Sequence, residues 1–278
     1  MTAVVLATVC AVVYGTADFF GGLATRRSRV FAVVVLSQSA GMAFVIALLP
    51  LLPGVPSWAG VLWGMSAGLA GAAGLLLFYW ALANGVMSVV APATATTSAA
   101  LPVLFGLATG ERPEPLALAG VVIALLAVTL VSRDPVRSAS TGTARPLIAA
   151  LASGAGFGGF FILLHQAPAD TGMWSLFGAR LVSISLVALL AVSTRRSLRP
   201  GRGTLRVIVA AGVLDMAANV LYLFAVQRGL LSLVAVLVSL YPASTLLLAR
   251  HVLGERLHAL QVAGVVAALA AVGLIAAA

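Results

Sequence analysis

Two stretches of the chain are near copies of each other: GERPEPLALAGVVIALL at residues 110–126 and GERLHALQVAGVVAALA at residues 254–270. The match extends further, because shifting residues 85–134 by 144 positions lays them on residues 229–278 without a gap, with 19 identities in 50 columns. A composition rich in Ala, Val and Leu raises such a count, but it does not account for the repeated Gly-Glu-Arg. The sequence therefore contains an internal duplication, which indicates two related structural units.

The composition favours the lipid bilayer as the surroundings of this chain. Apolar residue types make up 62% of its 278 residues and only 8% are charged, whereas soluble domains carry about a quarter charged residues. A globule in water cannot hide that much apolar surface, so a soluble enzyme, a nucleic-acid-binding module and a secreted disulfide scaffold are excluded. The single cysteine, Cys10, allows neither an internal disulfide nor a cysteine-based metal cluster. We expect no cofactor and no metal site.

Apolar runs between charged and Pro/Gly punctuation predict ten membrane-spanning helices. A helix needs about 20 apolar residues to cross the hydrocarbon layer, and the runs lack the period-two polarity of barrel strands. The predicted fold is therefore an all-α membrane protein. The expected spans are 2–24, 30–52, 58–83, 86–109, 115–132, 146–166, 172–193, 205–226, 229–249 and 258–278.

The longest polar stretch, residues 133–145, predicts a flexible linker between two halves of five spans each. We expect a first repeat over residues 1–134, a linker over 135–145 and a second repeat over 146–278. An odd number of spans per repeat forces the two copies into opposite orientations. Inverted repeats that meet near the midplane of the bilayer are the architecture of many secondary transporters.

The positions of the arginines predict the orientation. All sixteen basic residues are Arg, and the loops that follow spans one, five, seven and nine hold thirteen of them, whereas the opposite side holds only Arg112 and Arg228. Cytoplasmic loops carry the excess of basic residues. This rule puts the odd-numbered loops in the cytoplasm and both termini outside.

Ionisable side chains deep in an apolar span are costly and mark candidate functional sites. Three stand out: Asp18 in span one, Arg180 in span seven and Asp215 in span eight. Asp215, Asn219 and Tyr222 follow at helical spacing, so they share one stripe that should face a polar cavity; a buried structural hydrogen-bond network is the alternative. If Arg180 pairs with one carboxylate, the other has no fixed counter-charge and can hold a proton or bind a cationic group. For Asp18, anchoring of the helix end is the other interpretation.

Polar residues and prolines also gather in spans four and nine, which correspond under the repeat. Proline removes a backbone donor and kinks a helix, and broken helices in matching places of two halves point to a substrate site. The alternative is that the hydroxyls only satisfy carbonyls freed at the kinks. The candidate hinges are Pro92, Pro102 and Pro242, and the further candidate cavity residues are Gln38, Thr94, Ser98 and Tyr241.

Ten spans in a five-plus-five arrangement, with Gly-Glu-Arg closing spans four and nine and a Gly-Val-Val run soon after each, resemble the EamA family of the drug/metabolite transporter superfamily. The resemblance covers nearly the whole chain. It implies a multi-pass carrier of the plasma membrane that moves small metabolites, amino acids or toxic compounds. Characterised relatives usually have both termini inside, which is the reverse of what the arginines predict here.

The leading functional hypothesis is a secondary carrier that works by alternating access on a small-molecule substrate, with proton coupling as one mode. The alternatives are a channel or a lipid-headgroup flippase, and then an intramembrane enzyme. No Walker A motif drives transport directly, and neither a His pair on one helix nor a Gly-x-Ser-x-Gly turn supports an enzyme. We therefore expect no catalytic residues and no nucleic-acid partner.

Overall fold

A computed structural model describes residues 1–84, 87–132, 144–195, 197–254 and 257–278. In these ranges the chain forms helices and no strands. Ten helical segments are long and apolar enough to cross a membrane, as the sequence predicts. The helices are α1 (Thr2–Thr25), α2 (Val30–Leu48), α3 (Trp58–Asn84), α4 (Met87–Ala108), α5 (Pro115–Ser132), α6 (Ala144–His165), α7 (Trp174–Ser193), α8 (Leu205–Val226), α9 (Leu231–Val238), α10 (Tyr241–Leu253) and α11 (Ala259–Ala277), with a 3-10 turn at Ala169–Thr171.

The predicted spans agree with these helices to within a few residues, and the ninth differs most. It is expected at 229–249 but runs from Leu231 to Leu253 as two pieces, α9 and α10, separated at Ser239 and Leu240. The segment ends at Gly254, whose φ of 69° is the left-handed conformation that glycine adopts easily and that commonly closes a helix. The predicted linker at 133–145 lies largely outside the described residues.

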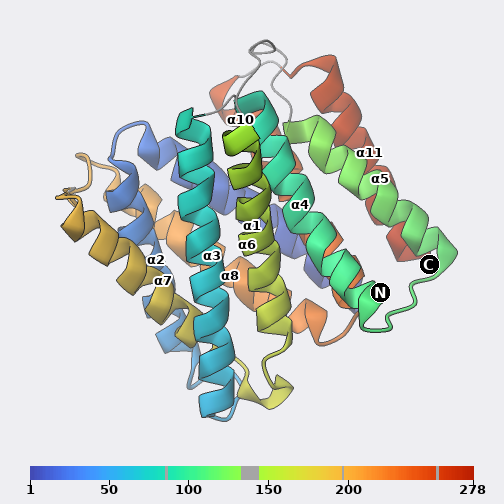
Figure 1. Ribbon diagram of the computed structural model, residues 1–278, viewed down its shortest axis with the longest axis horizontal. Coiled ribbons are helices and arrows are strands. Elements are labelled where there is room, and N and C mark those ends of the chain that lie inside the picture. Colours follow the sequence, from blue (N-terminus) through green and yellow to red (C-terminus); the bar gives the residue numbers. More distant parts are fainter. Residues whose placement is uncertain (85–86, 133–143, 196, 255–256) are drawn as a thin grey trace.

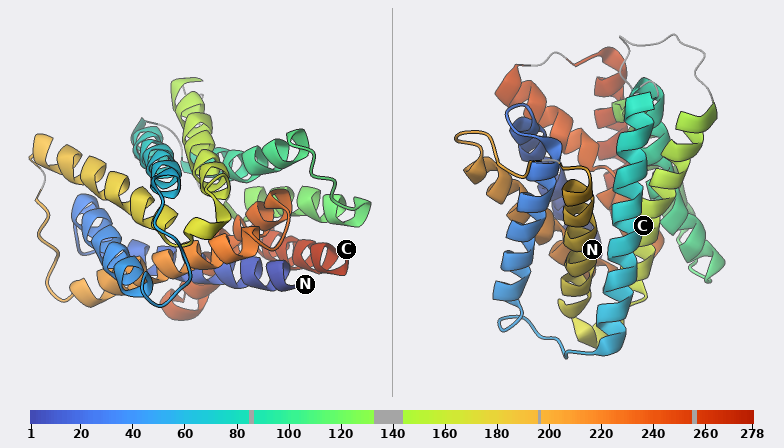
Figure 2. Two further views of the ribbon diagram at one scale, coloured as in Figure 1. Left: turned by 90° about the horizontal axis from the view of Figure 1, so that it is seen from below. Right: turned by 60° about the vertical axis from the view of Figure 1, so that its left-hand side comes forward.

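Successive helices run up and down through the molecule (Figure 1). The α1–α2 and α7–α8 connections lie toward the top of that view, and the α2–α3 and α6–α7 connections lie at the bottom. Both chain termini lie close together on the lower right, a proximity that the second orientation repeats (Figure 2). We call the two ends of the bundle the odd-loop end and the even-loop end, after the spans that their connections follow.

Helices from the two halves of the chain pack directly against each other. Helix α1 contacts α8 and α10, whereas α3 contacts α6 and α7; α2 lies against α7 and α8, α4 against α6 and α9, and α5 against α11. Glycines allow the closest approaches. A side chain added at Gly68 of α3 would overlap the backbone of Ala179 in α7, and one at Gly212 of α8 would overlap the backbone of Ser37 in α2.

The apolar core is concentrated at the even-loop end. Its largest cluster joins the start of α1, the end of α8 and all of α9, with Cys10, Tyr222 and Leu237 among its members. Only small clusters lie nearer the odd-loop end, around Ala24 and around Ala150. The two ends of the bundle therefore differ in how many apolar side chains pack together.

The divided ninth span shows the same asymmetry within a single segment. Seven of the eight residues of α9 are buried, whereas α10 has no buried residue. The side chains of α9 are therefore covered by neighbouring helices at the even-loop end, whereas those of α10 stay partly exposed at the odd-loop end.

Candidate functional site

An ion pair between α7 and α8 lies near the middle of the bundle. The Arg180 guanidinium donates from Nη2 to Oδ2 of Asp215. The Arg180 side chain is only 13% exposed, but that of Asp215 is 38% exposed, so one edge of the pair reaches open space. A charge buried in an apolar bundle needs a partner, and here the partner of Arg180 is Asp215 rather than Asp18.

A stripe of α1 faces the same region. Cys10 is fully buried and donates its Sγ–H to the Ala218 carbonyl of α8. One turn later, Tyr14 packs its ring on Tyr241 with the centroids 6.3 Å apart. One further turn along, the side chain of Asp18 is exposed. Exposure along this stripe thus grows toward the odd-loop end.

The exposed carboxylate of Asp18 faces the bundle rather than lipid. Val9 lies about two and a half helical turns before it, which places the two side chains on opposite faces of α1. The Val9 face, with Val5 and Val12, is an exposed apolar surface suited to acyl chains. The Asp18 face is the one that carries Tyr14 and Gly15, which contact α10. Asp18 therefore opens into a polar space between helices.

Asp18 lies on the face of α1 that also carries Cys10 and Tyr14, at successive helical turns. Cys10 binds the Ala218 carbonyl of α8 and Tyr14 packs on Tyr241 of α10, so this face points toward the helix that holds Asp215. Among the residues that the structure describes, Asp18 makes no hydrogen bond and no ion pair. The cluster holds two carboxylates and one guanidinium, so one negative charge has no fixed counter-ion. Such a site can attract a cation or take up a proton.

The break in the ninth span borders this cluster. Tyr241 and Pro242 form the first turn of α10, where a proline that lacks a donor is tolerated. Two hydroxyls of the next turn bind α1: Ser244 donates to the Ala11 carbonyl at 3.1 Å and Thr245 to the Gly15 carbonyl at 3.0 Å. The predicted interruption near Pro242 is therefore present, and its hydroxyls join α10 to α1.

Two of the three residues predicted to share a stripe of α8 are sealed in the core. Asn219 donates to the Asp215 backbone carbonyl at 2.8 Å, and its buried Oδ1 has no partner among the described residues. Tyr222 is fully buried and donates its hydroxyl to the Phe161 carbonyl of α6 at 2.8 Å. Tyr222 thus takes part in a buried structural hydrogen-bond network, which was the alternative interpretation of this stripe. The side chain of Asp215 is instead partly exposed.

We expect Tyr222→Phe to lower the free energy of unfolding by about 0.5–1.5 kcal/mol. The substitution keeps the ring but removes the hydroxyl that joins α8 to α6, and it leaves the Phe161 carbonyl without that donor. Thermal unfolding of the purified variant in detergent measures the effect. A melting temperature equal to that of the unchanged protein would mean that this bond contributes nothing at the closed end.

Two of the remaining candidates, Gln38 and Thr94, join helices to one another. Ser183 of α7 donates to Oε1 of Gln38 in α2, and buried Thr94 donates to the Ala150 carbonyl of α6 at 3.0 Å. Ser98 donates to the Ala95 carbonyl of its own helix. The proposed hinges Pro92 and Pro102 both lie inside α4, which runs as one uninterrupted helix, so a kink there stays a prediction.

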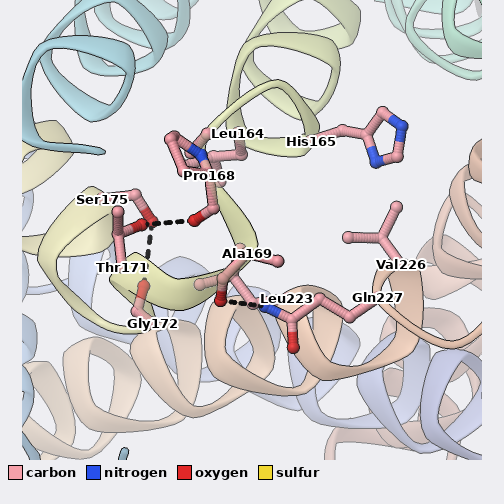
Figure 3. Close-up of a pocket in the computed structure, with 11 residues that line it drawn as sticks. Leu164, His165, Pro168, Ala169, Thr171, Gly172, Ser175, Leu223, Val226 and Gln227 are labelled. Carbon is pink, nitrogen blue, oxygen red and sulfur yellow. Dashed lines mark hydrogen bonds between the residues drawn. The ribbon is translucent and has the colours of Figure 1, made fainter. Parts of the chain in front are cut away.

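A pocket of about 220 Å³ lies at the even-loop end (Figure 3). Its walls come from the end of α6, the 3-10 turn, the start of α7 and the end of α8. His165 and Gln227 are its longest polar side chains, and the Gln227 amide points to the Ala169 carbonyl. None of the candidate cavity residues lines it. We assign no binding role to this pocket, because no predicted site residue lines it and Gln227, Thr171 and Ser175 donate to nearby backbone carbonyls.

Three further contacts, two in the central region and one at the even-loop end, lie outside the predicted site residues. Tyr14 could have been found, because it lies four residues from both Cys10 and Asp18 on one face of a helix. Ser183 carries no such signal, since its importance depends on which helix faces α7. Glu111 is recognisable only as part of the repeated Gly-Glu-Arg, yet its carboxylate contacts α9 across the chain.

The fold and this site define a multi-pass helical membrane protein with an ionised cluster between its two halves. Residues 144–277, which span the second half of the chain, match the model of the EamA-like transporter family. Among the curated proteins, none matches the sequence.

Solved structures share the fold. The chain matches 29 chains of solved structures. One of them, a crystal structure of a protein with 20% sequence identity, superposes with a TM-score of 0.78 and covers 98% of this chain and 95% of its own. At this identity the likeness concerns the fold alone.

Proposed function

We propose that the protein is a secondary carrier that moves a small solute by alternating access, and that it is open here at the odd-loop end. The observation that carries this proposal is the contrast between α9 and α10 around the ionised cluster. An exposed Asp18 lies toward the open end, and the buried Tyr222 lies toward the closed end. A carrier needs a binding site that is accessible from one side of the membrane at a time, and the difference in burial between the two ends supports such a site.

We infer an inverted repeat from the contacts between the two halves, and such a repeat would support the mechanism. Exchanging the two halves turns the contact of α1 with α8 into that of α6 with α3, and the contact of α2 with α8 into that of α7 with α3. The shift of 144 positions also carries Gly68 onto Gly212, and each of these glycines receives the backbone of a second-span helix from the other half. Two halves with equivalent contacts can exchange conformations, which opens the opposite end.

Asp18 is the proposed solute-binding or proton-binding group. Because Arg180 neutralises Asp215, the carboxylate without a counter-charge is that of Asp18. Tyr14 and Tyr241 lie beside it and offer aromatic faces, which attract cationic groups. The solute is therefore a small molecule with a cationic part, or a solute that exchanges with a proton held at Asp18.

The Arg distribution supports a plasma-membrane orientation with the odd-loop end in the cytoplasm. Arg26, Arg27 and Arg29 lie in the first of these loops. In this orientation the odd-loop end faces the cytoplasm and both termini lie outside. A reporter fused to the C-terminus tests the assignment: activity that requires the external compartment supports it, and cytoplasmic activity overturns it.

Asp18→Asn is expected to weaken solute binding by roughly tenfold or more in affinity, because the substitution removes a charge-assisted contact. Thermal-shift screening of amino acids, nucleosides, sugars and organic cations first finds a stabilising solute, and counterflow in liposomes then measures its transport across pH. Asp170→Asn is the control, since Asp170 lies exposed in the 3-10 turn at the even-loop end. Saturable counterflow supports a carrier, whereas flux without counterflow identifies a channel. Equal transport and equal pH dependence in both variants would contradict the role of Asp18.

A further inference from the structure

The carboxylate of Glu111 binds the first turn of α9. Glu111 lies in the connection between α4 and α5, and its Oε1 accepts the Leu231 N–H at 2.6 Å while its Oε2 accepts the Ser232 N–H at 3.0 Å. These are the first two amides of α9, which have no partner inside the helix. A carboxylate at a helix N-terminus gains both charge-assisted hydrogen bonds and a favourable interaction with the helix dipole.

The position of the carboxylate depends on Gly106, near the end of α4. A Cβ atom at this position would overlap Oε2 of Glu111 and lie 3.3 Å from Cβ of Ser232. The backbone also bends back here, since the Glu111 N–H donates to the Gly106 carbonyl at 2.9 Å. Gly106 therefore makes the space in which the carboxylate lies against α9.

The contact joins elements that the closed end keeps together. Glu111 follows the fourth span of the first half, whereas α9 is the buried piece of the ninth span in the second half. The Glu111 residue is half-buried and not sealed in. Water can therefore replace its bonds when the two elements separate. The interaction is strong enough to hold the closed end and accessible enough to be released.

We propose that Glu111 is a gating residue: the hydrogen bonds from the first two amides of α9 to its carboxylate keep the even-loop end closed. Opening that end requires the carboxylate to leave Leu231 and Ser232. The inference rests on the proposed alternating access, because a gate has meaning only where both ends open in turn. The inference goes further than that proposal, because it names one side chain that stabilises the conformation in which the even-loop end is closed.

Two substitutions remove the contact in different ways. Glu111→Gln keeps the size of the side chain but loses its charge and one of its two acceptor oxygens. Gly106→Ala keeps the carboxylate but fills its place. Glu114→Gln is the matched control, since Glu114 is an exposed acid of the same connection and its side chain makes no hydrogen bond among the described residues.

Hydrogen–deuterium exchange of residues 231–238 and alkylation of the native Cys10 by a thiol reagent report the opening. Both measurements use the full-length protein in lipid nanodiscs without added solute. Cys10 is fully buried at the closed end and is the only cysteine of the chain. We expect Glu111→Gln and Gly106→Ala to accelerate both processes by about tenfold, whereas Glu114→Gln matches the unchanged protein.

The outcomes separate a gate from a purely structural bond. Faster exchange confined to α9 and its neighbours at the even-loop end, with faster Cys10 alkylation, supports the gate. Uniformly faster exchange in all helices, or no change in either measurement, overturns it. Since no solute is needed, a chain that opens in this way but shows no counterflow fails only the proposed function. A chain that transports while both variants stay protected fails only the gate.

Discussion

Arg180→Leu is expected to lower the free energy of unfolding by roughly 2–4 kcal/mol and to abolish transport. The substitution leaves the Asp215 carboxylate inside the bundle without its guanidinium, and removal of one partner from a buried pair is strongly destabilising. Partial exposure of Asp215 lets water recover some of the loss, which places the effect below the upper end of that class. Thermal unfolding in detergent and counterflow in liposomes measure the two consequences.

The double variant Arg180→Leu with Asp215→Leu is the control. Replacing a whole buried ion pair by apolar side chains is often neutral or stabilising, so we expect the melting temperature to recover while transport stays lost. This separation of stability from activity is the signature of a functional ion pair. A double variant as unstable as Arg180→Leu alone would instead mean that the arginine acts through packing of its own stem.

The paired substitution of Gly64 and Gly68 by Ala should separate α3 from α7 and cost several kcal/mol, at roughly 1–3 kcal/mol for each overpacked position. The two glycines lie one turn apart, and a side chain at either would overlap backbone atoms of α7, at Ser175 and Ala179 respectively. Packing without voids is a main source of helix association in lipid, so a wider spacing loses contacts along both helices. Yield of folded protein and thermal unfolding give the measurement.

Gly273→Ala in α11 provides the comparison. A side chain there would meet no atom within 4 Å, and alanine favours a helix more than glycine does. We therefore expect this variant to be as stable as the unchanged protein or slightly more stable. If Gly64→Ala with Gly68→Ala behaved in the same way, the close approach of α3 and α7 would not matter for stability.

Much of the fold could be predicted from the sequence, because lipid imposes a simple rule. A segment in the bilayer must satisfy its own backbone hydrogen bonds, so each long apolar run becomes a helix. The ends of α5 and α8 coincide with the predicted spans for this reason. The ninth span could be predicted as interrupted from Pro242, but its continuation to Leu253 could not, since Arg250 and His251 in its last turn resemble the start of a loop.

The site was less predictable, because it depends on which helices face each other. Depth along the spans places Arg180 and Asp215 at a common level, but sequence leaves open whether the arginine pairs with Asp215 or Asp18. The ion pair between Arg180 of α7 and Asp215 of α8 decides it, and Asp18 of α1 is left exposed. The carboxylate of Glu111 is 120 positions from its partner Leu231 in the chain, and no local pattern predicts such a contact.

The hydroxyls of Ser244 and Thr245 affect which helices can move together. They join α10 to the carbonyls of Ala11 and Gly15, so we expect α10 and this part of α1 to move together. The interruption at Ser239 and Leu240 separates α10 from α9. In the proposed carrier, a solute bound at Asp18 would therefore displace α10 together with α1.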